Sequence, residues 1–199
     1  KRATLFMARD RYGIKPFYYY FDQHTFIFAS EIKAILLNKN VKKDICISAL
    51  DEYFTFQNIF SDKTLFKGIR MLPAGHHATI SMNNPRLNAR QYWDFDFSLT
   101  KSPDELSFAE ASSNVRWLFE QAVTRQLVSD VPGGSSLSGG MDSGTIVAVA
   151  KRNIPRLMTF TGGFDLSSVS GMELNFDERK ASELMASTFR TEHYEMVMH

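Results

Sequence analysis

One segment constrains the fold of this chain more than any other. Residues 131–149 read VPGGSSLSGGMDSGTIVAV, so a short strand runs into a loop with two adjacent glycines and an apolar helix follows. Gly139 and Gly140 can adopt backbone conformations that other residues avoid, which lets backbone N–H groups converge on an anion. The N-terminus of the helix adds unpaired N–H groups and a partial positive charge. The pattern predicts a strand–loop–helix unit that binds phosphate.

The side chains of this loop extend the prediction. Ser138 and Ser143 can donate hydroxyl hydrogen bonds to phosphate oxygens. Asp142 would repel a phosphate unless a cation lies between them, so the loop also predicts Mg²⁺ with Asp142 as its ligand. The loop has neither the lysine of a Walker A loop nor the Gly-x-Gly-x-x-Gly pattern. A bare Gly-Gly pair would indicate only a turn, but the full string in this context favours a nucleotide site.

The hydrophobic pattern changes along the chain. The first part is expected to be rich in strands, at 4–8, 17–21, 25–29 and 77–82, with helices at 31–37 and 48–56 and a loop at 65–75. Ser30 and Ser48 are predicted to cap the two helices. Residues 96–106 are polar and contain Pro103, which indicates a linker.

The last part alternates helices with strands. Helices are predicted at 108–128, from 143 onward and at 178–189, and strands at 157–161 and 193–198. Strands that alternate with helices are typical of a parallel sheet.

Composition excludes some classes of protein. The 199 residues contain 23 Lys and Arg and 22 Asp and Glu, a formal charge of +1, so nothing indicates nucleic acid or an anionic membrane. No run of about 18 apolar residues predicts a membrane span. Cys46 is the only cysteine, which excludes an internal disulfide, favours a cytoplasmic location and predicts a buried structural thiol.

A family resemblance follows from these motifs. Residues 138–143 resemble the pyrophosphate loop (PP-loop) of the ATP-pyrophosphatase superfamily. Further segments resemble glutamine-hydrolysing asparagine synthetases in the same order along the chain: 9–19 (RDRYGIKPFYY), 29–34 (ASEIKA), 63–75, 92–93, 131–132, 176–178 and 191–193. The chain is therefore identified as resembling that family over nearly its whole length.

The resemblance implies a fold that is α+β and then α/β. Residues 1–95 would be the latter part of an N-terminal-nucleophile glutaminase sandwich, the domain of a class II amidotransferase. Residues 96–106 would be the linker, and 107–199 the start of a parallel-sheet PP-loop ATP-pyrophosphatase domain. The glutaminase nucleophile of the family is an N-terminal Cys, whereas this chain begins with Lys1. We therefore expect an internal fragment without a catalytic nucleophile, inactive alone. The resemblance separately implies that a homodimer is possible for the whole protein.

The resemblance also implies a reaction and its site. Glutamine would supply ammonia, and ATP with Mg²⁺ would activate aspartate as β-aspartyl-AMP, giving asparagine, glutamate, AMP and diphosphate. Leu137 and Gly162 would flank the adenosine, and the Gly162 backbone would read the adenine edge. The phosphates would be held by Ser138, Gly139, Gly140, Asp142 and Ser143, with Mg²⁺ on Asp142. Glu178 and Glu192 are better interpreted as solvent-exposed charges.

Two departures leave alternatives open. Gly144 stands where a serine is usual, which should weaken the helix start by about 0.5–1 kcal/mol. Residues 166–174 (LSSVSGMEL) are longer than the family pattern, so the acceptor could be another carboxylate, such as a sugar acid of a surface polysaccharide. Two other hypotheses stay open. One is a β-lactam-synthetase-like ligase that uses ATP without glutamine, and the other is a remnant that binds nucleotide but catalyses no reaction.

Overall fold

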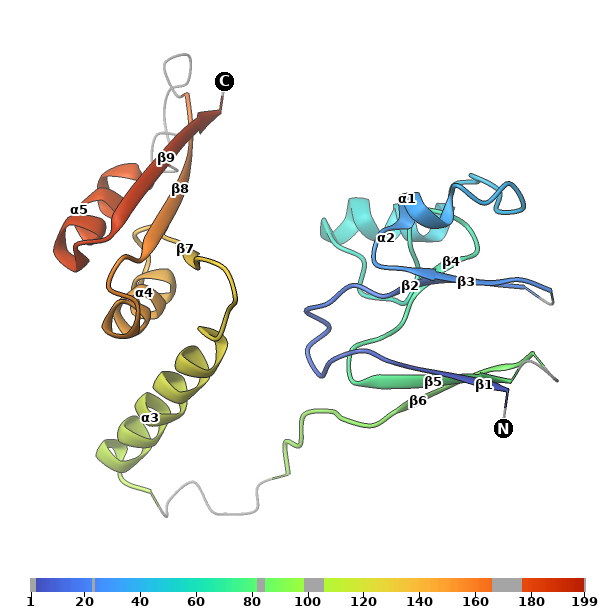
Figure 1. Ribbon diagram of the computed structural model, residues 1–199, viewed down its shortest axis with the longest axis horizontal. Coiled ribbons are helices and arrows are strands. Elements are labelled where there is room, and N and C mark those ends of the chain that lie inside the picture. Colours follow the sequence, from blue (N-terminus) through green and yellow to red (C-terminus); the bar gives the residue numbers. More distant parts are fainter. Residues whose placement is uncertain (1–2, 23, 82–84, 99–105, 166–176, 199) are drawn as a thin grey trace. The chain divides into compact units, whose positions relative to one another are not determined.

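The chain divides into two compact units, Lys1–Ser98 and Leu99–His199. A computed structural model describes residues 3–22, 24–81, 85–98, 106–165 and 177–198 (Figure 1). Most of the predicted linker and the long segment 166–174 lie outside the described residues.

The first unit contains two antiparallel sheets. One has the order β1-β5-β6 and the other β3-β2-β4. Their strands are β1 (Thr4–Ala8), β2 (Tyr18–Phe21), β3 (Phe26–Ala29), β4 (Ile69–Met71), β5 (His76–Ser81) and β6 (Leu87–Gln91). Buried side chains from both sheets meet in one cluster, which consists of Met7, Tyr19, Leu72, Ala78 and Ile80. The two sheets therefore pack face to face around a shared core.

The other face of the β3-β2-β4 sheet is also covered. Helix α1 (Ile32–Ile35) places Ile35 in a second buried cluster with Val41 and Ile69. Tyr18 and Tyr20 pack against this cluster, whereas Tyr19 between them faces the first one. Successive strand side chains point to opposite faces, so this aromatic strand is buried on both sides.

Several local expectations for this unit were wrong. Helix α2 spans Ile47–Phe56 with Cys46 as its N-cap, and the N-cap of α1 is Glu31; neither N-cap side chain accepts a capping hydrogen bond. The predicted caps Ser30 and Ser48 therefore do not start these helices. Strand β4 lies inside the segment expected to be a loop, and β6 was not predicted. Strand β4 is defined by its pairing with β2, which lies far from it in the sequence, whereas β6 pairs antiparallel with β5, the strand that precedes it.

Cys46 is half-buried rather than buried. Its Sγ lies 3.5 Å from Ser48 Oγ. This hydrogen bond is the main cause that lowers the pKa of the thiol. The expectation of an enclosed core cysteine is corrected accordingly.

The second unit is an α/β layer built on a parallel sheet, as the alternation of elements predicts. Strands β7 (Gly134–Ser136), β8 (Met158–Phe164) and β9 (Glu192–Met198) lie in the order β7-β8-β9. The helices are α3 (Phe108–Gln126), α4 (Met141–Asn153) and α5 (Arg179–Phe189). Helices α4 and α5 cover the same face of the sheet, and α3 packs on α4 (Figure 1). Right-handed crossovers between strands in consecutive order place both helices on one face.

One buried cluster joins these layers. It consists of Val123, Leu137, Val147, Val149, Ala150, Leu157 and Ala186. Helix α3 begins with a capping box, in which Ser107 and Glu110 exchange hydrogen bonds. Trp117 on α3 is 59% exposed and lies outside this cluster. On the open face of the sheet, Phe160 and Tyr194 stack with ring centroids 5.5 Å apart.

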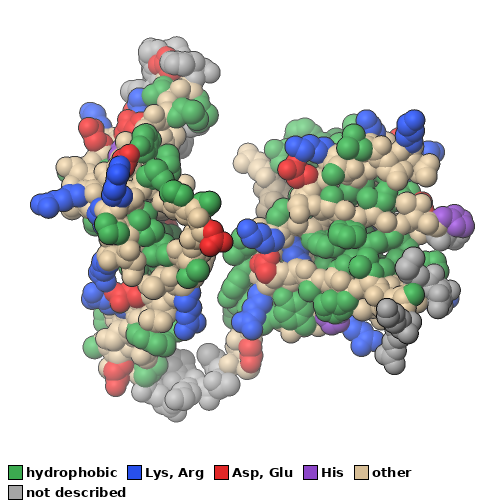
Figure 2. All heavy atoms as spheres, viewed as in Figure 1, with side chains coloured by type: hydrophobic (Ala, Val, Ile, Leu, Met, Phe, Trp, Pro, Cys, Tyr) green, Lys and Arg blue, Asp and Glu red, His purple; other side chains and the backbone are tan. Residues whose placement is uncertain are grey.

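Hydrophobic, basic and acidic side chains are spread over the visible face of each unit (Figure 2). Among the described residues, none of the helices has the length and apolar character that crossing a membrane requires.

Candidate nucleotide-binding site

The loop that follows β7 is anchored to β8 at its first residue. The Leu137 N–H donates to the Phe160 carbonyl oxygen at 2.9 Å, and the Thr161 hydroxyl donates to the Leu137 carbonyl. The Leu137 side chain is 1% exposed and lies in the core cluster. It supports the loop from the core side, so any contact with a nucleotide would come from its backbone. Sequence reasoning missed Thr161, because its partner lies 24 positions away.

A ring of hydrogen bonds closes the loop. The Ser143 hydroxyl oxygen accepts from the Ser138 N–H at 3.1 Å and lies 3.0 Å from the Ser138 hydroxyl. The Ser143 hydroxyl also donates to the Gly140 carbonyl at 3.3 Å, and the Gly140 N–H donates to Ser138 Oγ at 3.4 Å. The two serines thus join the beginning of the loop to the first turn of α4. They hold the loop shape, and would turn toward phosphate only by exchanging these bonds.

Gly139 meets two requirements that only glycine satisfies. Its φ is +79°, in the left-handed region. A Cβ atom here would lie 2.4 Å from Ala181 Cβ and 2.8 Å from the Ser182 backbone nitrogen. The first turns of α5 therefore form a wall directly behind the loop.

The N-terminus of α4 is open. Its N-cap is Gly140, which has no side chain to accept from the first-turn N–H groups. Asp142 is exposed in this first turn, where a carboxylate also favours the helix electrostatically. The loop and the helix end together offer backbone donors to an anion.

The end of β8 offers a second set of backbone groups. The Phe160 carbonyl accepts from Leu137, so the backbone of Phe160 faces β7. In a parallel sheet the backbone N–H and C=O of one residue point toward the same neighbouring strand. Those of the next residue point toward the opposite side. The N–H and C=O of Gly162 therefore face the side on which β7 has already ended at Ser136. One donor and one acceptor lie beside the loop, as the edge of a base requires.

An ion pair at the start of α5 also borders β8, and sequence reasoning did not identify it. Arg179 Nε and Nη2 donate to the two carboxylate oxygens of Asp177, each at 2.7 Å. These bonds lower the pKa of Asp177 to about 2. Arg179 and Asp177 lie near the site because of the crossover between β8 and α5, and no local sequence pattern predicts this.

The two glutamates interpreted as surface charges are both exposed. Glu178 occupies the N-cap position of α5. Glu192 accepts from the Tyr194 hydroxyl and from Arg156, and these bonds lower its pKa.

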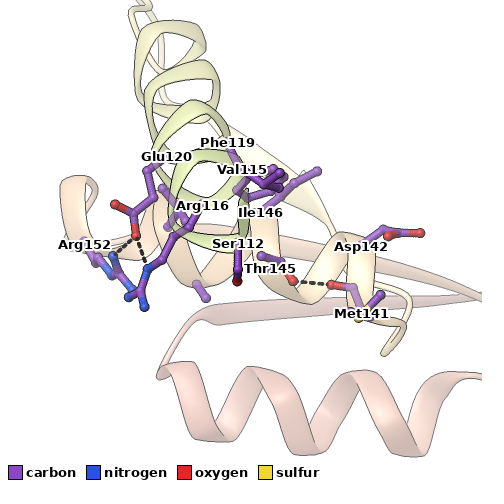
Figure 3. A pocket seen from close by; sticks show the side chains of 12 residues that line it. Ser112, Val115, Arg116, Phe119, Glu120, Met141, Asp142, Thr145, Ile146 and Arg152 are labelled. Carbon is purple, nitrogen blue, oxygen red and sulfur yellow. Dashed lines mark hydrogen bonds and ion pairs between the residues drawn. The ribbon is translucent and has the colours of Figure 1, made fainter. Parts of the chain in front are cut away.

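A groove of about 630 Å³ runs between α3 and α4 and reaches the loop at Met141 and Asp142 (Figure 3). Its middle is apolar, with Val115, Phe119 and Ile146. At its other end Glu120 accepts from Arg152 Nη1 at 2.9 Å and from Arg116 Nε at 3.3 Å. The groove therefore meets the start of α4 at one end and a pair of arginines that share Glu120 at the other.

Magnesium fits the loop only together with a nucleotide. Within the described ranges, no group of three or more His, Cys, Asp or Glu side chains could hold a metal ion. Magnesium keeps several waters and commonly uses one or two carboxylates with substrate phosphates. A single exposed carboxylate, Asp142, is sufficient for that mode.

In the first unit, the segment 9–19 that carries the resemblance builds a rigid turn. The Arg9 guanidinium donates to three carbonyls, those of Gly13 at 2.6 Å, Leu72 at 2.8 Å and Lys15 at 2.9 Å. Asp10 accepts from the N–H groups of Ile14 and Lys15, which lowers its pKa. These two residues shape the turn rather than present a reactive group.

Comparison with known proteins tests the family resemblance. Residues 1–93 match the family described as glutamine amidotransferase domain, and residues 114–199 match the family described as asparagine synthase. Together the two matches cover most of the chain, and relatives that align with all or nearly all of it are named glutamine-hydrolysing asparagine synthetases. The resemblance read from the motifs is confirmed.

Three relatives illustrate the match. Asparagine synthetase [glutamine-hydrolyzing] 3 of Bacillus subtilis is 38% identical, over 100% of this chain and 33% of the relative. A putative asparagine synthetase of Methanocaldococcus jannaschii is 32% identical, over 98% of this chain and 36% of the relative. Amidase chyE of Penicillium rubens is 33% identical, over 96% and 28%. The chain thus spans about a third of the length of these relatives.

Proposed function

We propose that this chain is part of a glutamine-dependent amide synthetase, with the ATP site on the loop 138–143. The observation that carries the proposal is the loop itself. It is closed by two serines, backed by α5 through Gly139, and followed by a helix N-terminus without a side-chain cap, and the backbone of Gly162 lies one strand away, beyond the last β7–β8 pair. The order of the two family matches supports an ammonia-supplying domain joined to it.

The proposed reaction proceeds in two steps. A carboxylate oxygen of aspartate attacks the α-phosphorus of ATP, the bond to the β-phosphate oxygen breaks, and diphosphate leaves. Ammonia released from glutamine then attacks the carbonyl carbon of β-aspartyl-AMP, loses a proton, and AMP leaves with the electron pair. The products are asparagine, glutamate, AMP and diphosphate.

Each residue of the site has a part in this chemistry. The N–H groups at the start of α4 would stabilise the charge that develops on diphosphate. Mg²⁺ held by Asp142 would neutralise phosphate charge. Ser138 and Ser143 keep the loop closed around the phosphates, and the Gly162 backbone would receive the adenine edge.

The acceptor carboxylate could differ from aspartate. Relatives whose names specify an amidase match this chain about as well as several of the asparagine synthetases do. The segment 166–174, whose length raised this alternative, lies outside the described residues. A ring-closing ligase of the β-lactam-synthetase kind would release diphosphate equally well with and without glutamine. The enzyme proposed here would need glutamine for that release.

Diphosphate release by the full protein tests the proposal. We expect release that requires ATP, Mg²⁺, glutamine and aspartate. Asp142→Ala should abolish release while glutamine hydrolysis continues, and Asp130→Ala, an exposed carboxylate outside the loop, should change neither. If diphosphate release requires another carboxylic acid in place of aspartate, only the proposed acceptor changes. Retention of both activities by Asp142→Ala would refute the loop assignment.

A further inference from the structure

The side chain of Arg179 is fixed at both of its ends. Its guanidinium makes two bonds of 2.7 Å to Asp177, and its own backbone N–H donates to Asp177 Oδ1 at 3.2 Å. The side chains of the pair are 31% and 27% exposed, so solvent reaches only part of them. A bidentate arginine–carboxylate contact of this kind defines a direction as well as a distance.

That direction places the Arg179 stem on the backbone of Gly163. A Cβ atom on Gly163 would lie 2.7 Å from Arg179 Cδ and 2.9 Å from its Nε. Gly163 is buried, and on the sheet it is paired with Val197 of β9. The end of β8 is therefore held by β9 on one edge and by Arg179 on the helix face, because β7 has already ended.

Two consecutive glycines make this support necessary. Gly162 and Gly163 have a wider range of backbone angles than other residues, so their peptide groups rotate easily when nothing holds them. A base edge is read only when the donor and the acceptor are held at a fixed angle. Any rotation at Gly163 would turn the polar groups of Gly162 away from that angle.

We propose that Arg179, anchored by Asp177, is a positioning residue that holds the Gly162–Gly163 backbone in the geometry that selects adenine over guanine. The inference rests on the proposed function and names the residues that set its nucleotide preference. Arg179 acts through Gly163 and needs no contact with the nucleotide.

The charges around Arg179 agree with a positioning role. Asp177 is the main cause that raises the pKa of the guanidinium, and Glu195 and Asp165 contribute in the same direction. Its charge is therefore already compensated by carboxylates. Because these carboxylates already balance its charge, the guanidinium attracts phosphate only weakly. The packing of the Arg179 side chain on Gly163 does not depend on that charge.

The test is the preference of the full protein for ATP over GTP, measured as the ratio of kcat/KM for diphosphate release. Arg179→Ala should raise the KM for ATP and lower the preference about tenfold, the size of one hydrogen bond, with kcat changed less. Asp177→Asn should act in the same direction. Arg179→Lys, which keeps the stem and the charge, should recover part of the preference.

Arg156 provides the matched control, since it also pairs with a carboxylate, Glu192 at 3.2 Å, but is far more exposed. Arg156→Ala should leave the preference unchanged. An unaltered preference in Arg179→Ala and Asp177→Asn, with ATP still used, would overturn this inference and leave the proposed function standing. If Arg179→Ala does not fold, Asp177→Asn and Arg179→Lys decide the question. Failure of the unmodified protein to use ATP would overturn both.

Discussion

Two glycine-containing turns, one in each unit, are held in different ways. In the turn 9–15, charged side chains bind the backbone: Arg9 occupies three carbonyls, and Asp10 occupies two N–H groups. In the loop 138–143, two hydroxyls join the ends, and the N–H groups at the start of α4 have no side-chain cap. The first arrangement saturates the backbone and makes a scaffold. The second closes the loop yet leaves donors for a ligand.

The largest effect is expected at Gly139, where the loop meets α5. Gly139→Ala forces a side chain into the left-handed region and within 2.4 Å of Ala181 Cβ, so the loop must move. We expect diphosphate release to fall by about 100-fold or more, as displacement of a site by about 1 Å can cause. Gly133→Ala is the control, because its nearest neighbour would be Ile154 Cδ1 at 3.9 Å. If Gly139→Ala releases diphosphate at a near-normal rate, the shape of the loop 138–143 does not control the reaction, and its contrast with the turn 9–15 is lost.

The scaffold turn should respond in stability rather than in ATP use. Arg9→Ala leaves three carbonyls without their donor, and we expect the first unit to lose about 2–3 kcal/mol in free energy of unfolding. Urea unfolding followed by aromatic fluorescence measures this loss. Arg90→Ala on β6 removes an exposed arginine and should cost far less. Equal losses would show that the Arg9 hydrogen bonds do not define the turn.

Acid should separate the two turns further. Asp10 has a pKa lowered from 3.8, chiefly by the Lys15 and Ile14 N–H groups, so its stabilising bonds are fully present above 3.8. They are lost as the pH falls from there through the lower, folded pKa. The hydrogen bonds that close the loop 138–143 involve hydroxyl and peptide groups, which do not titrate in this range.

Amide exchange, corrected for intrinsic rates, measures this difference. The Ile14 and Lys15 amides should lose protection at low pH, while the Ser138 amide should not change before global unfolding. Asp10→Asn should remove the pH dependence of the first two. Parallel loss at all three amides would contradict the comparison.

The smallest effect is expected at Gly144. A Cβ here would lie 2.8 Å from Met185 Sδ, the flexible end of a side chain that can move. Gly144→Ala gains helix propensity of about 1 kcal/mol, offset by displacement of Met185. We expect a change in thermal midpoint within about 2 °C. A large loss would mean that α4 and α5 pack here as rigidly as α5 and Gly139 do.

Local patterns were sufficient for much of this protein. The strand–loop–helix at 131–149 is visible because glycine freedom, serine hydroxyls and an apolar helix occur in one continuous segment. The alternation of helices and strands after residue 107 likewise predicted a parallel sheet. Element starts were less accurate, as at Ser30 and Ser48, since serine favours a cap but neighbouring residues can begin the helix instead.

The supports of the site could come only from the fold. Ala181 behind Gly139, Thr161 on the Leu137 carbonyl and Arg179 on Gly163 each join segments that are far apart in the chain. Crossovers between parallel strands bring these segments together, and no periodicity within either segment records the meeting. The sequence alone therefore predicts which residues form the proposed phosphate loop. The tertiary contacts decide how rigidly it is held, because rigidity depends on what packs behind the loop.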